Sequence, residues 1–285
     1  MDDTFIVTVF CIIDEVLVAA NHPEHPLAQA SDAEVLTVAV VAAASFANHH
    51  ERALQVLTRL GYLSGPLSVS RFNRRIHRLG DWLLGILDLV GELFLDGEAL
   101  FVIDSLPIPA CHRARATRCR KVQGRRFYGY IAAKRQIFFG WRIHLVVTPV
   151  GIPVAVALLP ASDHDLTCVA ELLYPLPSGA MVVADKAYNS QAVEAGVLEA
   201  SGVRLVPIRK AKMAPNTWLE RQVLHPLRSR IESVNSQLEA MGIERLHART
   251  CPGVEIKIAA SLLALAWINI IAHAVPLAQQ LLRPH

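Results

Sequence analysis

The first 95 or so residues carry apolar positions at the three- and four-residue spacing of amphipathic helices. Ser31 and Glu34 form a capping-box pattern ahead of an apolar stretch that continues to Ala47. A second helix is expected from about residue 50 to residue 60, because Gly61 is a suitable residue just after a helix end. Another amphipathic helix is expected from about residue 81 to residue 95. The pattern therefore predicts an all-helical N-terminal region.

Between these helices, residues 68–79 form a short predicted helix with two unlike faces. Its apolar face consists of Val69, Phe72, Ile76 and Leu79. Its remaining surface carries four arginines, which are Arg71, Arg74, Arg75 and Arg78. A cationic helix of this kind fits the recognition helix of a helix-turn-helix unit, which lies in the major groove of DNA. An ordinary solvated helix face is the alternative, and the pattern alone leaves both open.

From residue 99 onward the pattern changes to short apolar runs that are typical of strands. Strands are expected at 99–103, 141–148, 152–159, 180–184 and 203–208. Helices are expected at 165–174, 189–201, 227–242 and 254–274. Three early strands followed by alternating helices and strands indicate an α/β fold, a mixed sheet with flanking helices. We therefore expect two domains, a helical one over 1–97 and an α/β one over 98–285 with C-terminal helices.

Composition is that of a globular protein, with 53% hydrophobic and 19% charged residues. The five cysteines include no Cys-x-x-Cys pair, which disfavours a zinc ribbon and a disulfide scaffold and fits a reducing cytoplasm. The adjacent pairs His49–His50 and Cys111–His112 have no second pair at a metal-site spacing, so we interpret both as incidental. No basic segment that would begin a signal peptide follows Met1, and the apolar stretch 258–274 is expected to be a core helix rather than a membrane span.

Two of the apolar runs end in a carboxylate. Asp104 follows the run 99–103, and Asp185 follows the run 180–184. In open α/β sheets, functional groups gather at strand ends. Two carboxylates held together repel unless a cation lies between them, and Mg²⁺ and Mn²⁺ prefer such oxygen ligands. A single Asp after a strand more often begins a turn or caps a helix, so the pair carries this interpretation.

A third candidate carboxylate lies in the predicted helix 227–242. Arg228, Glu232 and Asn235 share one face of that helix at positions i, i+4 and i+7. A surface ion pair between Arg228 and Glu232, worth about 0.3–0.5 kcal/mol, also explains two of these residues. From the helix alone, this ion pair is the favoured explanation, and a catalytic role for Glu232 needs further support.

Five short motifs, in order, resemble the DDE transposases of bacterial insertion sequences, most closely the insertion sequence 982 family. The motifs are Val102-Ile103-Asp104-Ser105-Leu106-Pro107-Ile108-Pro109, Trp141-Arg142-Ile143-His144-Leu145, Ala161-Ser162-Asp163-His164-Asp165, Ala184-Asp185-Lys186-Ala187-Tyr188 and Arg230-Ile231-Glu232. The resemblance implies an RNase H-like fold in which Asp104, Asp185 and Glu232 bind metal and catalyse the reaction. It implies two Mg²⁺ or Mn²⁺ ions, roughly 3.5–4 Å apart, and no small-molecule cofactor.

The chain departs from a related group of transposases whose signature is Tyr-x2-Arg-x3-Glu-x6-Lys. Arg228 and Glu232 match that signature, whereas His225 stands at the Tyr position and Glu239 at the Lys position. Ala187 stands where Gly is common in the second of the carboxylate motifs. The resemblance therefore leaves open which side chains contact the ends of the DNA element.

The charge distribution also favours a nucleic-acid partner. The segment 113–135 contains no acidic residue, and its aromatic residues are interleaved with nine cations: Arg113, Arg115, Arg118, Arg120, Lys121, Arg125, Arg126, Lys134 and Arg135. Such a segment can follow phosphates and stack on bases, although a solvated basic loop is the alternative. The residues expected to contact DNA here and further on are Arg120, Lys121, Arg125, Arg126, Arg209, Lys210 and Arg228. His144 and Lys186 are expected to support the metal site from outside it.

The combined expectation is a cytoplasmic, nucleoid-associated transposase that acts as a homodimer on DNA and has no membrane partner. It would cut DNA at the ends of an insertion sequence and join those ends to target DNA. An RNase H-like nuclease without joining activity is one alternative. A non-catalytic DNA-binding regulator derived from a transposase is another, although three converging carboxylates have no use in a protein that only binds.

Overall fold

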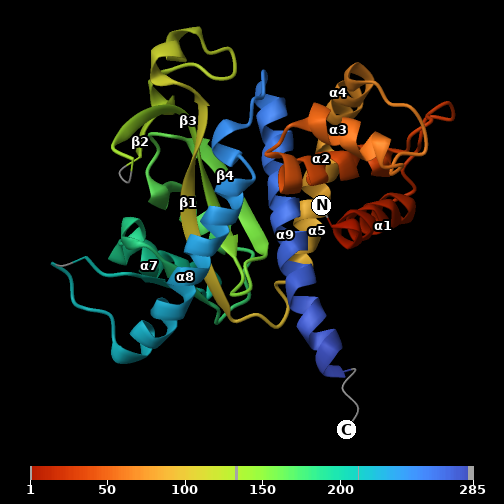
Figure 1. Cartoon of the computed structure of the whole chain (residues 1–285). Helices are drawn as coiled ribbons and strands as arrows, with labels where there is room; N and C mark the ends of the chain where they lie inside the picture. The colour runs from red at the N-terminus through yellow and green to blue at the C-terminus, as the bar shows by residue number, and fades with distance from the viewer. Residues whose placement is uncertain (1, 132–133, 211, 282–285) are drawn as a thin grey trace. The chain divides into compact units, whose positions relative to one another are not determined.

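The computed structural model describes residues 2–131, 134–210 and 212–281 and forms two compact units, whose elements are drawn in Figure 1. Unit 1 combines Met1–Leu89 with Gln237–His285, and unit 2 is Val90–Ser236. The sequence predicted a single boundary at 97/98, which places residues 237–285 in the α/β domain. The structure groups them with the N-terminal helices because α9 (Cys251–Leu281) packs against several of those helices.

Unit 1 is built around α2 and the central part of α9, which pack against each other and hold most of its buried apolar residues. Its N-terminal helices are α1 (Asp3–Ala19), α2 (Asp32–Phe46), α3 (His50–Arg59), α4 (Val69–Arg78) and α5 (Gly80–Leu93), the last of which continues into unit 2. The predicted capping box begins α2, since the Glu34 amide donates to Ser31 Oγ at 3.0 Å and the Ser31 amide donates to Glu34 Oε2 at 2.6 Å. The predicted N-terminal helical region is therefore confirmed.

Asn48, just after α2, ties the N-terminal helices of unit 1 to its C-terminal ones. Ala47 and Asn48 both have left-handed backbone, with φ of 47° and 64°, which ends α2 and turns the chain. The Asn48 Nδ2 donates to the Met241 carbonyl and to Ser261 Oγ, both at 2.9 Å. Because this side chain is only 1% exposed, both bonds are shielded from competing water.

The α9 helix explains the most apolar stretch of the sequence. Residues 251–274 are long and apolar enough to cross a membrane, but 72% of that apolar window is buried inside the fold. Burial against α2 gives this stretch a protein partner for its apolar surface. It has the burial expected of the core helix that the sequence predicts.

Unit 2 contains a mixed six-stranded sheet. Its strands are β1 (Leu100–Cys111), β2 (Tyr128–Ile131), β3 (Gln136–Val147), β4 (Pro153–Pro160), β5 (Met181–Ala184) and β6 (Arg204–Pro207). β1, β3 and β4 are antiparallel neighbours, while β5 and β6 extend the sheet from β1 in parallel. The order β4-β3-β1-β5-β6 is the RNase H-like arrangement, with the short β2 added beside β3.

Helices flank the sheet of unit 2, as Figure 1 shows for α7 and α8. They are α6 (Val169–Leu173), α7 (Gln191–Ser201) and α8 (Trp218–Ala240), and α8 continues into unit 1. Short 3₁₀ turns occur at Arg113–Arg118, Arg125–Phe127, Asp165–Cys168, Lys186–Tyr188 and, in unit 1, at Ile243–Arg245. Side chains of β1, β5, β6, α6 and α7 form one continuous apolar core, which holds the strand ends rigidly.

Three strands differ from the prediction. β3 begins at Gln136, five residues before the predicted start at 141, because its first residues pair with β2. β1 continues eight residues past the predicted end at Ile103, through Pro107 and Pro109, because it pairs with β3 as far as Cys111. Proline lacks the N–H that a ladder needs, but β5 pairs with β1 only up to Ile103, so among the described strands the far edge of β1 is open there. β2 was not predicted, because its residues are polar and aromatic rather than continuously apolar.

Candidate active site

Sheet register brings Asp104 and Asp185 to neighbouring positions. Ile103 of β1 pairs with Ala184 of β5 in parallel, and the two aspartates directly follow this pair. Asp104 lies inside β1, which continues to Cys111, whereas Asp185 directly follows the last residue of β5. The parallel register still leaves both aspartates one residue beyond the same pair. The structure therefore brings together the first two carboxylates of the predicted triad, although they are 81 positions apart in the sequence.

Glu232 of α8 lies at the same pocket as the two aspartates. Asp104, Asp185, Arg228 and Glu232 are among the residues that line a cavity of about 120 Å³ beside the end of β5 and the neighbouring part of β1. The Glu232 side chain is 66% exposed, and its Oε1 accepts from Arg228 Nε at 3.3 Å. The surface ion pair that the sequence left open is thus present, on the rim of the pocket that the two aspartates line.

Asp104 is a buried carboxyl group with acidic neighbours. Burial raises its pKa above the usual range, and the negative charges of Asp185 and Asp165 raise it further. Two hydrogen bonds oppose this, one from Asn235 Nδ2 to Asp104 Oδ2 at 2.8 Å and one from a backbone amide. A cation at this position would offset the repulsion between the carboxylates and favour the ionised form of Asp104.

The donor chemistry of the pocket fits a hard divalent cation. Carboxylate oxygens from β1, β5 and α8 line it, and the buried Asn235 Oδ1 has no hydrogen-bond partner. In the arrangement drawn, no three His, Cys, Asp or Glu side chains of the described residues converge closely enough to hold an ion. Since Glu232 is exposed and its ion pair with Arg228 is also exposed, its side chain has the freedom to turn inward.

A polar network lies directly behind Asp104 and joins four of the five motifs. Asp165 Oδ1 accepts from Ser105 Oγ at 3.3 Å, and Arg142 donates to the same hydroxyl at 3.2 Å. His144, which is fully buried, bonds through Nδ1 to the Tyr188 hydroxyl at 3.1 Å. Burial lowers the pKa of His144 to about 4, although Asp165, whose Oδ1 is 3.8 Å from His144 Nε2, acts in the opposite direction.

The position of His144 is compatible with the supporting role that the sequence predicts for it. Four further residues of this site were not predicted to have a role. Ser105, Asp165, Tyr188 and Asn235 all belong to this network or to the bond on Asp104. Each lies in or next to a recognised motif, which is the signal that points to them. Lys186 has an exposed side chain in the turn after β5. His164, also exposed, accepts from the Leu166 amide at 3.2 Å.

The candidate DNA-binding cations of unit 2 differ in their exposure and in their contacts. Arg120, Arg125, Lys210 and Arg228 have exposed side chains. Lys121 instead donates to the Ala110 carbonyl, and Arg126 donates to Asp163 Oδ2 at 2.7 Å while remaining 63% exposed. Arg209 forms a two-point pair with Glu194, at 2.6 and 2.7 Å, and this pair joins the end of β6 to α7. Its geometry is that of a structural contact.

The aromatic side chains of the basic segment also differ in their packing and exposure. The Phe127 ring packs against Phe139 and Trp141, with ring centres 6.1 Å away in both cases. Tyr128 packs edge-on against Phe139 at 4.8 Å. Tyr130 is 54% exposed. Of these three aromatic residues, Tyr130 is therefore the best placed to stack on a base.

In unit 1, the four arginines of α4 also differ in their exposure and contacts. Arg71, Arg74 and Arg78 are exposed. Arg75 is 14% exposed, donates through Nη1 to the Ala30 carbonyl at 2.6 Å and pairs with Asp32. Burial alone would raise the pKa of Asp32, but hydrogen bonds from His22 and Arg75 lower it below the usual value. Arg75 therefore fastens α4 to the start of α2.

The fold and the acidic strand ends define a candidate catalytic domain of the RNase H-like class. Residues 96–267 match the Transposase DDE domain family, and this chain belongs to that family. No curated protein matches the chain.

Among solved structures, the chain is similar to two complexes of the Mos1 transposase. The paired-end complex with the left transposon end is 11% identical over 78% of this chain and 81% of that chain, with a TM-score of 0.25. The pre-cleavage Mos1 transpososome is 14% identical over 88% and 81%, with the same TM-score.

Proposed function

We propose that this transposase, of the insertion sequence 982 type, cuts DNA at the ends of its element and joins those ends to target DNA. The observation that carries the proposal is that Asp104 of β1, Asp185 just after β5 and Glu232 of α8 line one pocket. Sequencing the DNA on either side of the gene tests it. Matching inverted repeats flanked by a short duplication are expected, and flanks without either would argue against the proposal.

In the proposed mechanism, Asp104, Asp185 and Glu232 hold two Mg²⁺ or Mn²⁺ ions. When bound, these ions supply Lewis-acid stabilisation of the transferring phosphate and a more acidic attacking hydroxyl group. Asn235 fixes the orientation of the Asp104 carboxylate, and the apolar core beneath keeps the two strand ends in register. Cleavage and joining use the same in-line displacement at phosphorus, because only the nucleophile changes, from water to a DNA 3′-hydroxyl.

The proposed DNA path in unit 2 uses the exposed cations of the basic segment, with Arg120 and Arg125 foremost. Arg126 and Lys121 contribute charge at the edge of this surface, while Lys210 and Arg228 extend it. Phosphates give such a surface affinity without sequence preference. We expect a homodimer on DNA, acting in the cytoplasm on the nucleoid.

A hydrogen bond to Asp104 provides the first prediction within this mechanism. Asn235→Ala removes the donor that orients Asp104 and is expected to lower cleavage by about 10–100-fold, mainly through weaker metal binding. A titration of cleavage against Mg²⁺ should therefore show a higher half-saturating concentration. The matched control is Ser233→Ala, on the exposed face of the same helix. If Asn235→Ala keeps the wild-type Mg²⁺ dependence, Asn235 has no positioning role.

The α4 helix of unit 1 is proposed to read the end of the element. In the full-length chain, Arg71→Ala or Arg74→Ala is expected to leave the melting temperature unchanged. A base-reading arginine should cost about 1–3 kcal/mol at one position of the site, whereas a phosphate contact should weaken every sequence alike. Arg75→Ala should instead lower the melting temperature, because Asp32 loses its ion-pair partner. Equal melting temperatures for the Arg75 and Arg71 variants would contradict this division.

A further inference from the structure

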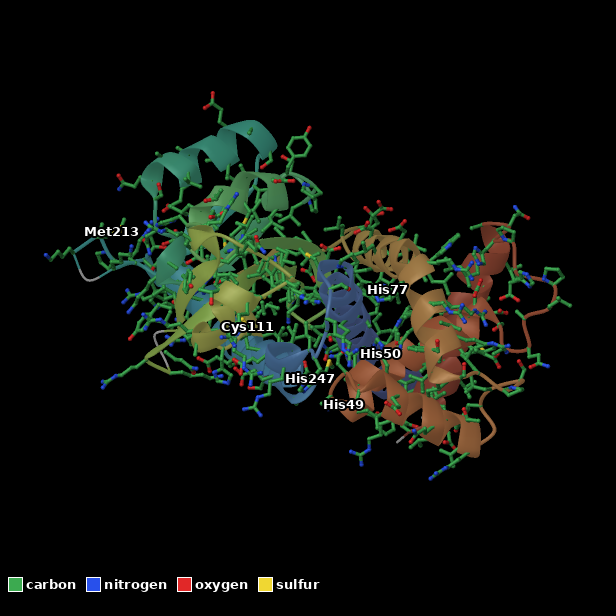
Figure 2. All side chains as sticks on the ribbon, turned by 90° about the horizontal axis from the view of Figure 1, so that it is seen from above. His49, His50, His77, Cys111, Met213 and His247 are labelled. Atoms are coloured by element: carbon green, nitrogen blue, oxygen red, sulfur yellow. The ribbon has the colours of Figure 1, made fainter. Side chains whose placement is uncertain are left out.

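Unit 1 also has a basic groove, which does not include the α4 arginines. Four histidines line it: His49 and His50 from the start of α3, His77 from α4 and His247 from the segment before α9. Figure 2 shows these side chains drawn together from three separate stretches of the chain. The groove has a volume of about 870 Å³, and we call it the histidine groove. The pair His49–His50, incidental in the sequence, becomes part of a cluster here.

The histidine groove has a positive lining. Arg52 of α3, Arg249 before α9 and Lys257 of α9 contribute fixed cations, and Glu51 is the carboxylate among its described lining residues. Arg52 and Arg249 are exposed, so their guanidinium groups are accessible to a ligand. Lys257 is less accessible and donates to the Asn48 carbonyl at 2.5 Å. An anion with several oxygens, such as a phosphodiester, complements this lining better than an apolar ligand does.

A polar atom without a partner also belongs to this groove. His50 packs edge-on against Phe72 at 5.3 Å, and its Nε2 is buried without a hydrogen-bond partner. Burial, together with the charges of Lys257 and His77, lowers the pKa of His50 to about 3, so this ring is neutral. Burial also lowers the pKa of Lys257, to about 8. A bound anion would stabilise the protonated form of each group and so raise both pKa values.

The groove is not a metal site. His49 and His247 stack with ring centres 5.1 Å apart, and no group of three His, Cys, Asp or Glu side chains among the described residues is placed to hold an ion. The surrounding arginines and Lys257 would also repel a cation. Negative charge is therefore the chemistry that the groove accepts.

We propose that the histidine groove binds the phosphate backbone of duplex DNA through Arg52 and Arg249, separately from the α4 arginines. This inference rests on the proposed function, because it takes DNA as the substrate. The groove requires residues from both ends of the chain, since α3 and α4 supply one side and residues 247–257 supply the other. Backbone binding by unit 1 would then depend on the C-terminal segment as much as on the N-terminal helices.

The test compares paired variants of the full-length protein on duplex DNA of random sequence. Arg52→Ala combined with Arg249→Ala is expected to reduce the log–log salt slope of binding by about 1.8, the value for two lost phosphate contacts. The matched control is Arg59→Ala combined with Arg245→Ala, since these arginines are exposed on α3 and just after α8 but do not line the groove. The control should keep the wild-type slope. Arg52→Lys combined with Arg249→Lys should keep it too.

The outcomes distinguish a failure of this inference from a failure of the proposed function. If the wild-type protein binds duplex DNA and the groove variant keeps its slope, the inference is wrong and the proposed function stands. If the control variant loses as much slope as the groove variant, the groove is not a distinct site. If the wild-type protein does not bind duplex DNA even at low salt, the proposed function itself fails. Should the double variant lose its cooperative melting transition, Arg52→Gln alone is used, with an expected loss of about 0.9.

Discussion

Replacing Asp104 or Asp185 with Asn is expected to lower DNA cleavage by more than about 10³-fold while DNA binding survives. Each substitution removes a charged oxygen ligand from a site where metal is proposed to stabilise the transferring phosphate. Glu232→Gln should behave alike, although Glu232 is exposed and paired with Arg228. Cleavage of a labelled duplex carrying the element's end, measured in Mg²⁺, gives the rates.

Stability distinguishes loss of chemistry from loss of folding in these variants. Burial and the nearby charges of Asp185 and Asp165 raise the pKa of Asp104, so the charged form is disfavoured in the fold. Asp104→Asn removes that charge and should leave the melting temperature unchanged or raise it. Glu199→Gln, an exposed carboxylate on α7, is the matched control and should keep full activity. Near-normal cleavage by any of the three site variants would show that the residue concerned is not part of the triad.

Neutralising the exposed cations of the basic segment is expected to have the largest effect on DNA affinity. Changing Arg115, Arg118, Arg120 and Arg125 together to Ala should reduce the log–log salt slope of DNA binding by about 3.6, if each contacts one phosphate. The loss should be similar for every duplex sequence, because phosphates carry no sequence information. Binding isotherms at several salt concentrations measure it directly.

A charge-preserving variant separates electrostatics from folding of the basic segment. The same four positions changed to Lys should keep the wild-type slope, since each phosphate contact needs a cation rather than a particular side chain. Lys121 and Arg126 are left in place because Lys121 donates to the Ala110 carbonyl and Arg126 pairs with Asp163. An unchanged slope in the Ala variant would mean that the segment is a solvated loop.

The pattern of strands and helices was largely readable because it depends on local periodicity. The capping box of Ser31 and Glu34, the end of α3 and the hairpin of β3 and β4 all follow from short-range rules. The sequence predicted that Asp104 and Asp185 both follow strand ends. Only β5 ends at that point, since β1 continues to Cys111, and the parallel register of β1 and β5 is what puts the two aspartates at neighbouring positions. Each of these inferences needs only a few neighbouring residues and one general rule.

What the sequence did not reveal depends on contacts between distant segments. The bond from Asn235 to Asp104 joins positions 131 residues apart, and the helical pattern that puts Asn235 on the face of Glu232 does not show which partner it contacts. The assignment of residues 237–285 to the helical unit rests on packing of α9 against α2, which periodicity does not specify. Likewise, the pairs of Arg75 with Asp32 and of Arg209 with Glu194 could not be anticipated, so their arginines looked equivalent to the exposed ones.

The central claim is that one carboxylate site both cuts and joins DNA, and a strand-transfer assay tests it most directly. The purified protein is incubated with Mg²⁺, a labelled duplex bearing the element's end and an unlabelled target plasmid. The account predicts labelled plasmid in which the 3′ end of the element is covalently joined, with no joined product from the Asp185→Asn variant. Cleaved duplex without any joined product would identify a nuclease and contradict the account.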